Sequence, residues 1–325
     1  MWSRPVMVGS ECERTTASDL NTVVFFKGKC RMKASYLSVF SYPDQPLVNL
    51  QFAGIQEGED LLNGKILADK DVVGEVKNGI LILVNPDQEW ETKRLGELRE
   101  GGYIPRNWDN EISGSKRNSR RRGFCDELAT IDGFILEVGT GPGGGNMCPV
   151  LERNPEALII ANDITLAPLR LWEEFFKTEG LGTHVCFAAF DAREKVLRDG
   201  SIAAVSSSGG FSNITQSAKA IQAANKALRP DGMCFMMESR VHSDDWAQMP
   251  EDRRRFWEER LFGLVEGYED LVHQAGFLIE SKEIIPVGVY DPEGSGLARD
   301  AAKHGVKLRR SIEYLKARKP ERKKT

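Results

Sequence analysis

The stretch Phe134-Ile-Leu-Glu-Val-Gly-Thr-Gly-Pro-Gly-Gly-Gly145 decides the fold of this chain. Residues 134–138, which are apolar except for Glu137, predict a buried parallel strand, because strands covered on both faces are mostly apolar. The glycines that follow predict a tight turn from this strand into a helix, where a ligand can lie against bare backbone. We therefore expect the chain to hold a small ligand at this turn.

The glycine spacing alone does not identify the ligand. Gly139, Gly141 and Gly144 also satisfy the G-x-G-x-x-G spacing of dinucleotide-binding folds, so a nicotinamide oxidoreductase is an alternative. Glu137 helps to discriminate, since it lies two residues before the first glycine, near the mouth of the loop. A carboxylate there would repel a pyrophosphate and attract an ammonium or sulfonium group. The charge pattern therefore favours a cationic ligand.

At these residues the chain resembles the class I methyltransferases that depend on S-adenosylmethionine (SAM). The family signature is an acidic residue, any residue, then Gly-x-Gly-x-Gly, and Glu137, Gly139, Gly141 and Gly143 match it. The resemblance covers about residues 115–319 and implies SAM as the cofactor. It also implies an α/β fold, with a Rossmann-like, seven-stranded, mostly parallel sheet and helices on both faces.

The next elements in the chain fit this resemblance. A second apolar run ends in Asn162-Asp163, and Asp163 lies 24 residues after Gly139 (163 − 139). This spacing is close to the ~20 residues at which an acidic residue reaches the ribose in such folds, so we expect Asp163 to bind ribose. Its alternative role is to cap the helix that starts near Thr165. The helix predicted over residues 146–153 would point its N-terminus at the SAM carboxylate.

A third predicted strand, 184–190, ends in Asp191-Ala192. Family members often carry Asp-Ala at this strand end, and the resemblance assigns Asp191 and Ala192 to adenine. The resemblance also places Thr140, Ile164 and Ser207 in the cofactor site. The family's closing strands are expected at residues 277–289 and 311–319, the last one antiparallel.

The methyl acceptor is not identified by any motif. Residues 206–213 end the fourth strand and are the expected place for substrate contacts. They are not an Asn-Pro-Pro-Tyr type sequence, which lowers the case for a nucleic-acid base as substrate. Residues 238–265 are expected to cover the substrate. His242 in this segment is a candidate general base because of its ordinary pKa, and a surface histidine is an equal alternative.

Four functions therefore stay open at this stage. The favoured one is transfer of a methyl group from SAM to a small-molecule acceptor through an O, N or C nucleophile. The alternatives are an RNA or protein methyltransferase, a nicotinamide oxidoreductase, and a non-catalytic SAM-binding protein.

Residues 1–100 differ from the rest, and we expect a β-rich module there, followed by the methyltransferase domain at 101–325. Short β-type runs at residues 23–26, 36–40 and 80–84 alternate with Gly, Pro, Asp and Asn. The favoured interpretation is a packing appendage or a homodimer surface. The alternative is a lid over the substrate.

Charge argues against nucleic acid as a general partner. The net charge is −4 and the sequence pI is about 5.8. Residues 115–122 nevertheless form a basic cluster, Ser-Lys-Arg-Asn-Ser-Arg-Arg-Arg, which could bind RNA phosphates or an anionic substrate. Because no aromatic residues interleave these charges, the favoured interpretation is the solvated start of a helix.

Cysteines and apolar runs bear on the compartment. No apolar run approaches the roughly 20 residues that span a bilayer, and the first residues lack a signal-peptide pattern, so we expect a cytoplasmic protein without a membrane partner. No C-x-x-C pair is present, and we expect no metal site and reduced, mostly buried thiols. Arsenic methylation, which uses cysteine ligands, is left open. The cysteines are Cys12, Cys30, Cys125, Cys148, Cys186 and Cys234.

Overall fold

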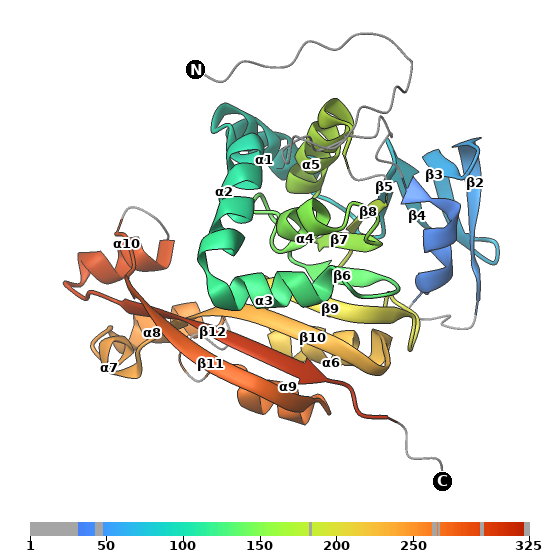
Figure 1. The fold of residues 1–325 in the computed structure, drawn as a ribbon. Helices are drawn as coiled ribbons and strands as arrows, with labels where there is room; N and C mark the ends of the chain where they lie inside the picture. The colour runs from blue at the N-terminus through green and yellow to red at the C-terminus, as the bar shows by residue number, and fades with distance from the viewer. Residues whose placement is uncertain are drawn as a thin grey trace, which may run out of the picture.

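A computed structural model describes residues 32–42, 48–181, 184–261, 265, 267–292 and 296–321. A mixed sheet runs through these residues, with helices on both faces (Figure 1). Seven neighbouring strands follow the order β8-β7-β6-β9-β10-β12-β11. They are β6 Ile135–Val138, β7 Ile159–Asp163, β8 Val185–Ala189, β9 Ile202–Ser208, β10 Leu228–Val241, β11 Leu278–Val289 and β12 Arg309–Arg318. The five neighbouring strands β8, β7, β6, β9 and β10 pair in parallel, and β12 is antiparallel to β10 and β11. This arrangement confirms the predicted Rossmann-like fold.

The sheet is longer than predicted, because it continues past β8 into the N-terminal part of the chain. Strand β5 pairs in parallel with β8, and four antiparallel strands follow it. These are β5 Ile80–Ile82, β4 Asp71–Lys77, β3 Asp60–Ala68, β2 Leu50–Glu57 and β1 Met32–Lys33. The described sheet thus has 12 strands rather than the predicted seven. Without β5, the backbone groups of β8 on that side would form an open sheet edge, and pairing with β5 satisfies them. The domain boundary at residue 100 stays a prediction.

The predicted N-terminal strands have different outcomes. Residues 80–84 do contain a strand, β5. The prediction for residues 36–40 was wrong, because a short 3-10 helix, Ala34–Val39, occupies this segment. Tyr36 and Val39 are both buried, and a spacing of three residues places them on one face of a 3-10 helix. Residues 23–26 lie outside the described part of the chain.

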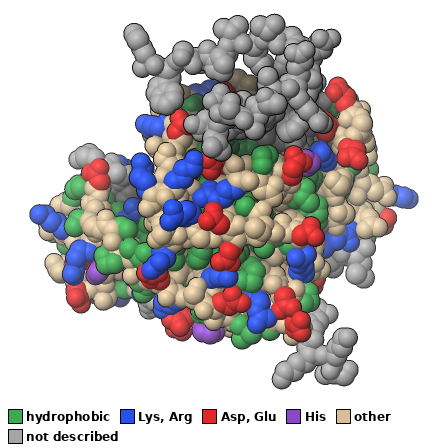
Figure 2. All heavy atoms as spheres, in the orientation of Figure 1, with side chains coloured by type: hydrophobic (Ala, Val, Ile, Leu, Met, Phe, Trp, Pro, Cys, Tyr) green, Lys and Arg blue, Asp and Glu red, His purple; other side chains and the backbone are tan. Residues whose placement is uncertain are grey.

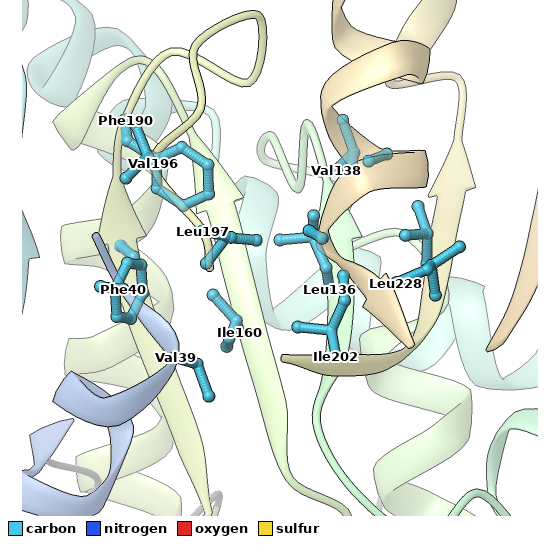
Figure 3. Packing of buried hydrophobic residues seen from close by; sticks show 14 of the residues in the cluster. Val39, Phe40, Leu136, Val138, Ile160, Phe190, Val196, Leu197, Ile202 and Leu228 are labelled. Carbon is cyan, nitrogen blue, oxygen red and sulfur yellow. The ribbon is translucent and has the colours of Figure 1, made fainter. Parts of the chain in front are cut away.

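Two hydrophobic cores cover the two faces of the sheet. Alternation along β6 explains why it is apolar except for Glu137: Ile135 packs in one core, and Leu136 and Val138 pack in the other. Figure 3 shows the second core, where Leu136 lies near Ile160 of β7 and Ile202 of β9. Burial on both sides therefore holds in place the strand that leads into the glycine turn.

The helices divide between these two cores. Those packed on the Ile135 side are α1 Gln88–Glu100, α2 Tyr103–Arg117, α3 Ser119–Leu128, α4 Met147–Arg153 and α5 Leu166–Glu179. Those on the Leu136 side are α6 Ser217–Ala227 and α9 Glu269–Gln274. A third, smaller core joins α7 Ser243–Trp246 to α10 Gly296–Lys303, with α8 Glu251–Glu258 packed against it through Trp257. Along the described chain, no helix combines the length and the apolar character needed to cross a bilayer.

Glu91 of α1 joins the N-terminal part of the chain to helix α5. Its side chain is buried, and its two carboxylate oxygens accept hydrogen bonds from the backbone amides of Leu166 (2.8 Å) and Ala167 (2.7 Å). These amides belong to the first turn of α5, where backbone donors have no partner within the helix. The carboxylate therefore caps a helix that lies 75 residues later in the chain.

We expect the Glu91→Ala variant to lower the free energy of unfolding by about 1–3 kcal/mol, because two buried amides lose their acceptor. Denaturant unfolding followed by circular dichroism measures this change. The Glu89→Ala variant is the matched control, since Glu89 is exposed in the same helix. Equal stability of the two variants would show that the capping contact contributes nothing.

Candidate ligand-binding site

A cavity of about 470 Å³ lies at the carboxyl ends of the central strands. Six of the residues predicted to bind the cofactor form part of its wall: Gly139, Gly141, Asp163, Ile164, Asp191 and Ala192. The wall also contains residues that the sequence reasoning did not assign to the cofactor: Pro142, Asn162, Phe190, Arg193, Gly209, Gly210, Asn213, Ile214 and Thr215. The strand ends β6, β7, β8 and β9 thus converge on one cavity, as expected for an open α/β sheet.

The glycine turn needs glycine because two segments of backbone approach closely. Gly139 has a φ of +64°, and a Cβ atom added to it would lie 2.8 Å from the Cα atom of Gly210. Gly141 has a φ of +51°, a conformation that L side chains rarely adopt. A side chain at either position would strain the wall of the cavity.

Side chains from three elements hold the glycine turn in place. Asn107 Nδ2 of α2 donates to Pro142 O at 2.8 Å, and Trp172 Nε1 of α5 donates to Gly141 O at 2.9 Å. Asp163 Oδ2 accepts from Gly141 N at 2.9 Å. The backbone of the turn is thereby oriented before any ligand binds. Trp172 is itself fully buried in the core.

Asp163 stands at the end of β7, as predicted, and serves two segments. Its Oδ2 holds Gly141, and its Oδ1 accepts from the backbone amide and the hydroxyl of Thr165, both at 2.9 Å. Burial raises the pKa of this carboxyl, against the effect of these hydrogen bonds. Asp163 therefore bonds to the residue that precedes α5, in line with its alternative role, and also lines the cavity. Contact with ribose stays a prediction.

Asp191 is held by a side chain that the sequence reasoning overlooked. Arg193 donates to both carboxylate oxygens of Asp191 over 2.6–3.0 Å, and both residues line the cavity. Burial acts to raise the pKa of Asp191, but the hydrogen bonds from Arg193 outweigh it, so the pKa lies below its ordinary value. The carboxylate is thus kept ionised. In the sequence, the only sign of this ion pair was that an arginine, Arg193, follows Asp191 two residues later.

Glu137 lies differently from the sequence expectation. Its side chain is 1% exposed, and it is absent from the described cavity wall. Oε1 accepts from Asn146 N at 3.1 Å, at the start of α4, where the ligand carboxylate was expected. Burial raises the pKa of Glu137 to about 7. The carboxylate therefore turns toward the protein interior and holds the end of the glycine turn, and its direct contact with the cofactor stays a prediction.

Three other predicted residues lie outside the described wall. Gly143 is part of the glycine turn but does not line the cavity. Thr140 is 2% exposed, and its hydroxyl has no hydrogen-bond partner among the described residues. Ser207 is fully buried and bonds to Glu238. Their roles in cofactor binding stay predictions.

A second buried carboxyl, Glu238 of β10, holds the opposite wall of the cavity. Its Oε1 accepts from Ser207 Oγ at 2.5 Å, and its Oε2 accepts from Ser212 N at 3.0 Å. Ser207 Oγ in turn accepts from the amides of Gly210 and Phe211, both at 3.1 Å. Burial raises the pKa of Glu238 to about 7. An acidic residue directly after the apolar run 233–237 was the signal that could have revealed this contact.

His242 does not line the cavity. It is partly buried near the end of β10, and its Nε2 lies 3.0 Å from Ser311 Oγ of β12. It does not belong to the described cavity wall, and neither do residues 243–261. Segments α7 and α8 instead pack in the third core. The proposed general base and the substrate cover therefore stay predictions.

The basic cluster at residues 115–122 is largely paired with acids. Lys116 lies 2.5 Å from Glu152, Arg120 pairs with Glu283, and Arg121 pairs with Glu111. Figure 2 shows positive and negative side chains next to one another on the face that α2 and α3 form. Arg121 is buried and donates to Gly145 O at 2.8 Å, which adds a further anchor to the glycine turn. The prediction of a solvated helix start is correct only in part, because residues 115–117 end α2, residues 119–122 begin α3, and Ser115 and Arg121 are buried.

The described cysteines are buried and free: Cys125, Cys148, Cys186 and Cys234. This confirms the expectation of buried thiols for these four residues. Burial raises the pKa of Cys125 to about 12, so its thiolate is disfavoured. Over the described part of the chain, no three His, Cys, Asp or Glu side chains are grouped in a way that could hold a metal ion.

Residues 136–236 match the family model described as "Methyltransferase domain", which confirms the predicted family for this part of the chain. No curated protein matches the chain.

Several solved structures are similar at low identity. The 4+2 cyclase SpnF is 20% identical over 62% of this chain and 80% of its own, with a TM-score of 0.48. The YcgJ protein of Bacillus subtilis is 16% identical over 62% and 98%, with a TM-score of 0.46. A phosphoethanolamine N-methyltransferase of Haemonchus contortus, solved with S-adenosyl-L-methionine, is 16% identical over 59% and 49%, with a TM-score of 0.44. At these TM-scores, the likenesses carry no argument about activity.

The buried Glu238 carboxyl makes stability depend on pH. Its pKa of about 7 in the folded chain exceeds the ordinary 4.5, so the folded state retains a proton that the unfolded state releases between these values. The contribution of the protonated Glu238 to the free energy of unfolding is fully present below about pH 4.5 and is lost as the pH rises through about 7. The Glu238→Gln variant should reduce the fall in the free energy of unfolding between about pH 5 and about pH 8 by about 1–3 kcal/mol.

Urea titrations of the wild type and the variant at these two pH values measure the difference. The control is Glu179→Gln, because Glu179 is exposed at the end of α5. If all three proteins lose stability in parallel, the Glu238 carboxyl is not protonated in the folded chain.

Proposed function

Since residues 136–236 of this chain belong to the methyltransferase-domain family, we propose that the chain is a SAM-dependent methyltransferase acting on a small-molecule acceptor. The observation that carries this proposal is the cavity at the carboxyl ends of β6 to β9, with its glycine turn and its acidic strand ends. The cavity lies within the segment that matches the family model.

The charges in the cavity wall favour a cationic ligand. The described wall contains two carboxylates, Asp163 and Asp191, and one guanidinium, Arg193. Arg193 is already engaged by Asp191. A diphosphate would add two negative charges beside these acids without an unpaired cation in the wall to meet them, whereas SAM brings a sulfonium and an ammonium. This argument favours SAM over a nicotinamide dinucleotide and no longer needs Glu137 at the rim.

The residues present suit SAM in three places. Asp163 is assigned to the ribose hydroxyls, since its Oδ2, which accepts from Gly141 N, can accept a further hydrogen bond, whereas Oδ1 already accepts two from Thr165. Asp191 and Ala192 are assigned to adenine, and Ile164, which is 50% exposed beside them in the wall, offers an apolar contact for the ring. The buried hydroxyl of Thr140, which has no partner among the described residues, is a candidate donor to the amino-acid part.

When bound, SAM would supply a methyl group on a positively charged sulfur. A lone pair of the acceptor would bond to the methyl carbon while the carbon–sulfur bond breaks and the sulfur leaves as a neutral thioether. The part left to the protein is to orient the acceptor and to exclude water, so no universal catalytic residue is required. The anchored glycine turn and the Glu238 contacts hold the cavity wall rigid, which helps to keep the reactants oriented. An amine or thiol acceptor needs little more, while a hydroxyl acceptor needs a base, for which His242 stays the candidate.

Calorimetry with the full chain tests the identity of the ligand. We expect SAM to bind more tightly than NADH, and the Asp163→Asn variant to weaken SAM binding at least about tenfold, because it loosens Gly141 and removes a charged acceptor. The matched control is Asp132→Asn, since Asp132 is exposed outside the cavity. Tighter binding of NADH would favour an oxidoreductase instead.

Turnover distinguishes an enzyme from a binding protein. The chain is incubated with methyl-labelled SAM and a fractionated cell extract, and we expect the label in the small-molecule fraction. Label in the RNA or protein fraction would identify the acceptor as a macromolecule. SAM binding with no transfer to any fraction would indicate a non-catalytic protein.

A further inference from the structure

A second hollow lies on the sheet face that α2 and α3 cover. It is an open groove of about 630 Å³ between the α2–α3 junction and strands β10, β12 and β11. The junction contributes Gly114 and residues 117–121, and the strands contribute Met237, Glu283, Ile285, Ile312 and Tyr314. None of these residues lines the first cavity, so the groove is a separate surface.

The groove and the first cavity meet at the end of β9. Gly209 belongs to the cavity wall, and its backbone amide donates at 2.8 Å to Met237 O, whose residue belongs to the groove wall. Arg121, in the groove wall, donates to Gly145 O of the glycine turn. The groove wall is therefore bonded to the cavity wall by one backbone hydrogen bond and to the glycine turn by one side chain.

The strand order indicates which end of the ligand faces the groove. The proposed contacts place adenine at β8 and ribose at β7, and the glycine turn follows β6. Along the sheet, the next strands are β9 and β10, so the methyl-donating end of SAM lies on the side of the groove. This step rests on the proposed function.

The chemistry of the groove combines an apolar floor with a cationic rim. Met237, Ile285 and Ile312 supply the floor, and Asn118 Nδ2 donates to the Tyr314 hydroxyl at 2.6 Å at its side. The rim carries three guanidinium groups, two of which are paired with Glu283 and Glu111. Arg117, by contrast, is exposed and makes no ion pair or hydrogen bond with the described residues. One cation of the rim is thus available to a ligand.

We propose that this groove holds the methyl acceptor, and that the acceptor is a small molecule with an apolar body and a carboxylate or phosphate group bound near Arg117. An anion gains a charge-assisted hydrogen bond from the guanidinium while its apolar part covers the floor. The volume suits a small ligand, since pockets for such ligands span roughly 300–1,000 Å³. RNA is disfavoured, because most cations around the groove are already paired.

Calorimetry with phenyl phosphate, benzoate and neutral benzyl alcohol tests the proposed selectivity on the full chain. At least one of the two anions should bind more tightly than benzyl alcohol, and which one does distinguishes a phosphate from a carboxylate acceptor. The Arg117→Gln variant should weaken the bound anion about fivefold. The Arg122→Gln variant is the matched control, since Arg122 is exposed on α3 outside the groove wall.

The labelled-SAM incubation supplies a second readout. The labelled product should be retained on an anion exchanger, and its yield should fall with Arg117→Gln but not with Arg122→Gln. Equal binding of benzyl alcohol and both anions, no binding of any probe, or equal behaviour of the two variants would overturn the proposal. So would an RNA oligonucleotide that binds through Arg117 while the small anions do not. Absence of SAM binding by the wild type would instead contradict the proposed function.

Discussion

Two buried carboxyl groups hold together the two backbone segments that enclose the cavity. Glu137 on β6 bonds to Asn146 at the end of the glycine turn, and Glu238 on β10 bonds to Ser207 and Ser212 beside the facing segment. Strand β9 lies between β6 and β10, so the two acids act from either side of it. Because both side chains are buried, each contact forms in a low-dielectric environment where an unmet partner is costly. The shape of the cavity depends on these contacts.

This arrangement changes where the charge of the site resides. The acid of the family signature faces inward, and the carboxylates that meet the cavity come from the ends of β7 and β8. Hydrogen bonds from Arg193 hold the pKa of Asp191 below its ordinary value, whereas burial raises the pKa of Asp163. The proposed cationic ligand would thus meet acidic residues from strand ends that are brought together, and the signature acid acts as a support for the glycine turn.

The N-terminal part of the chain contributes to the same core. Strand β5 pairs directly with β8, whose end carries Asp191, and Glu91 of α1 caps the helix that begins after Asp163. Asn107 of α2 holds the glycine turn through Pro142. Changes in residues 80–121 can therefore alter the cavity without touching a ligand. This connection agrees with the proposal that the groove at the α2–α3 junction holds the acceptor.

The sequence by itself determined the strand, the glycine turn and the positions of Asp163 and Asp191. These features are local, since apolar runs predict buried strands and the residue after a run lies at a strand end. Only the tertiary structure decided the inward direction of Glu137, the contact between Ser207 and Glu238, and the anchoring of the turn by Asn107 and Trp172. Side-chain direction depends on which distant elements pack together, and a pattern read along one chain segment does not contain that information.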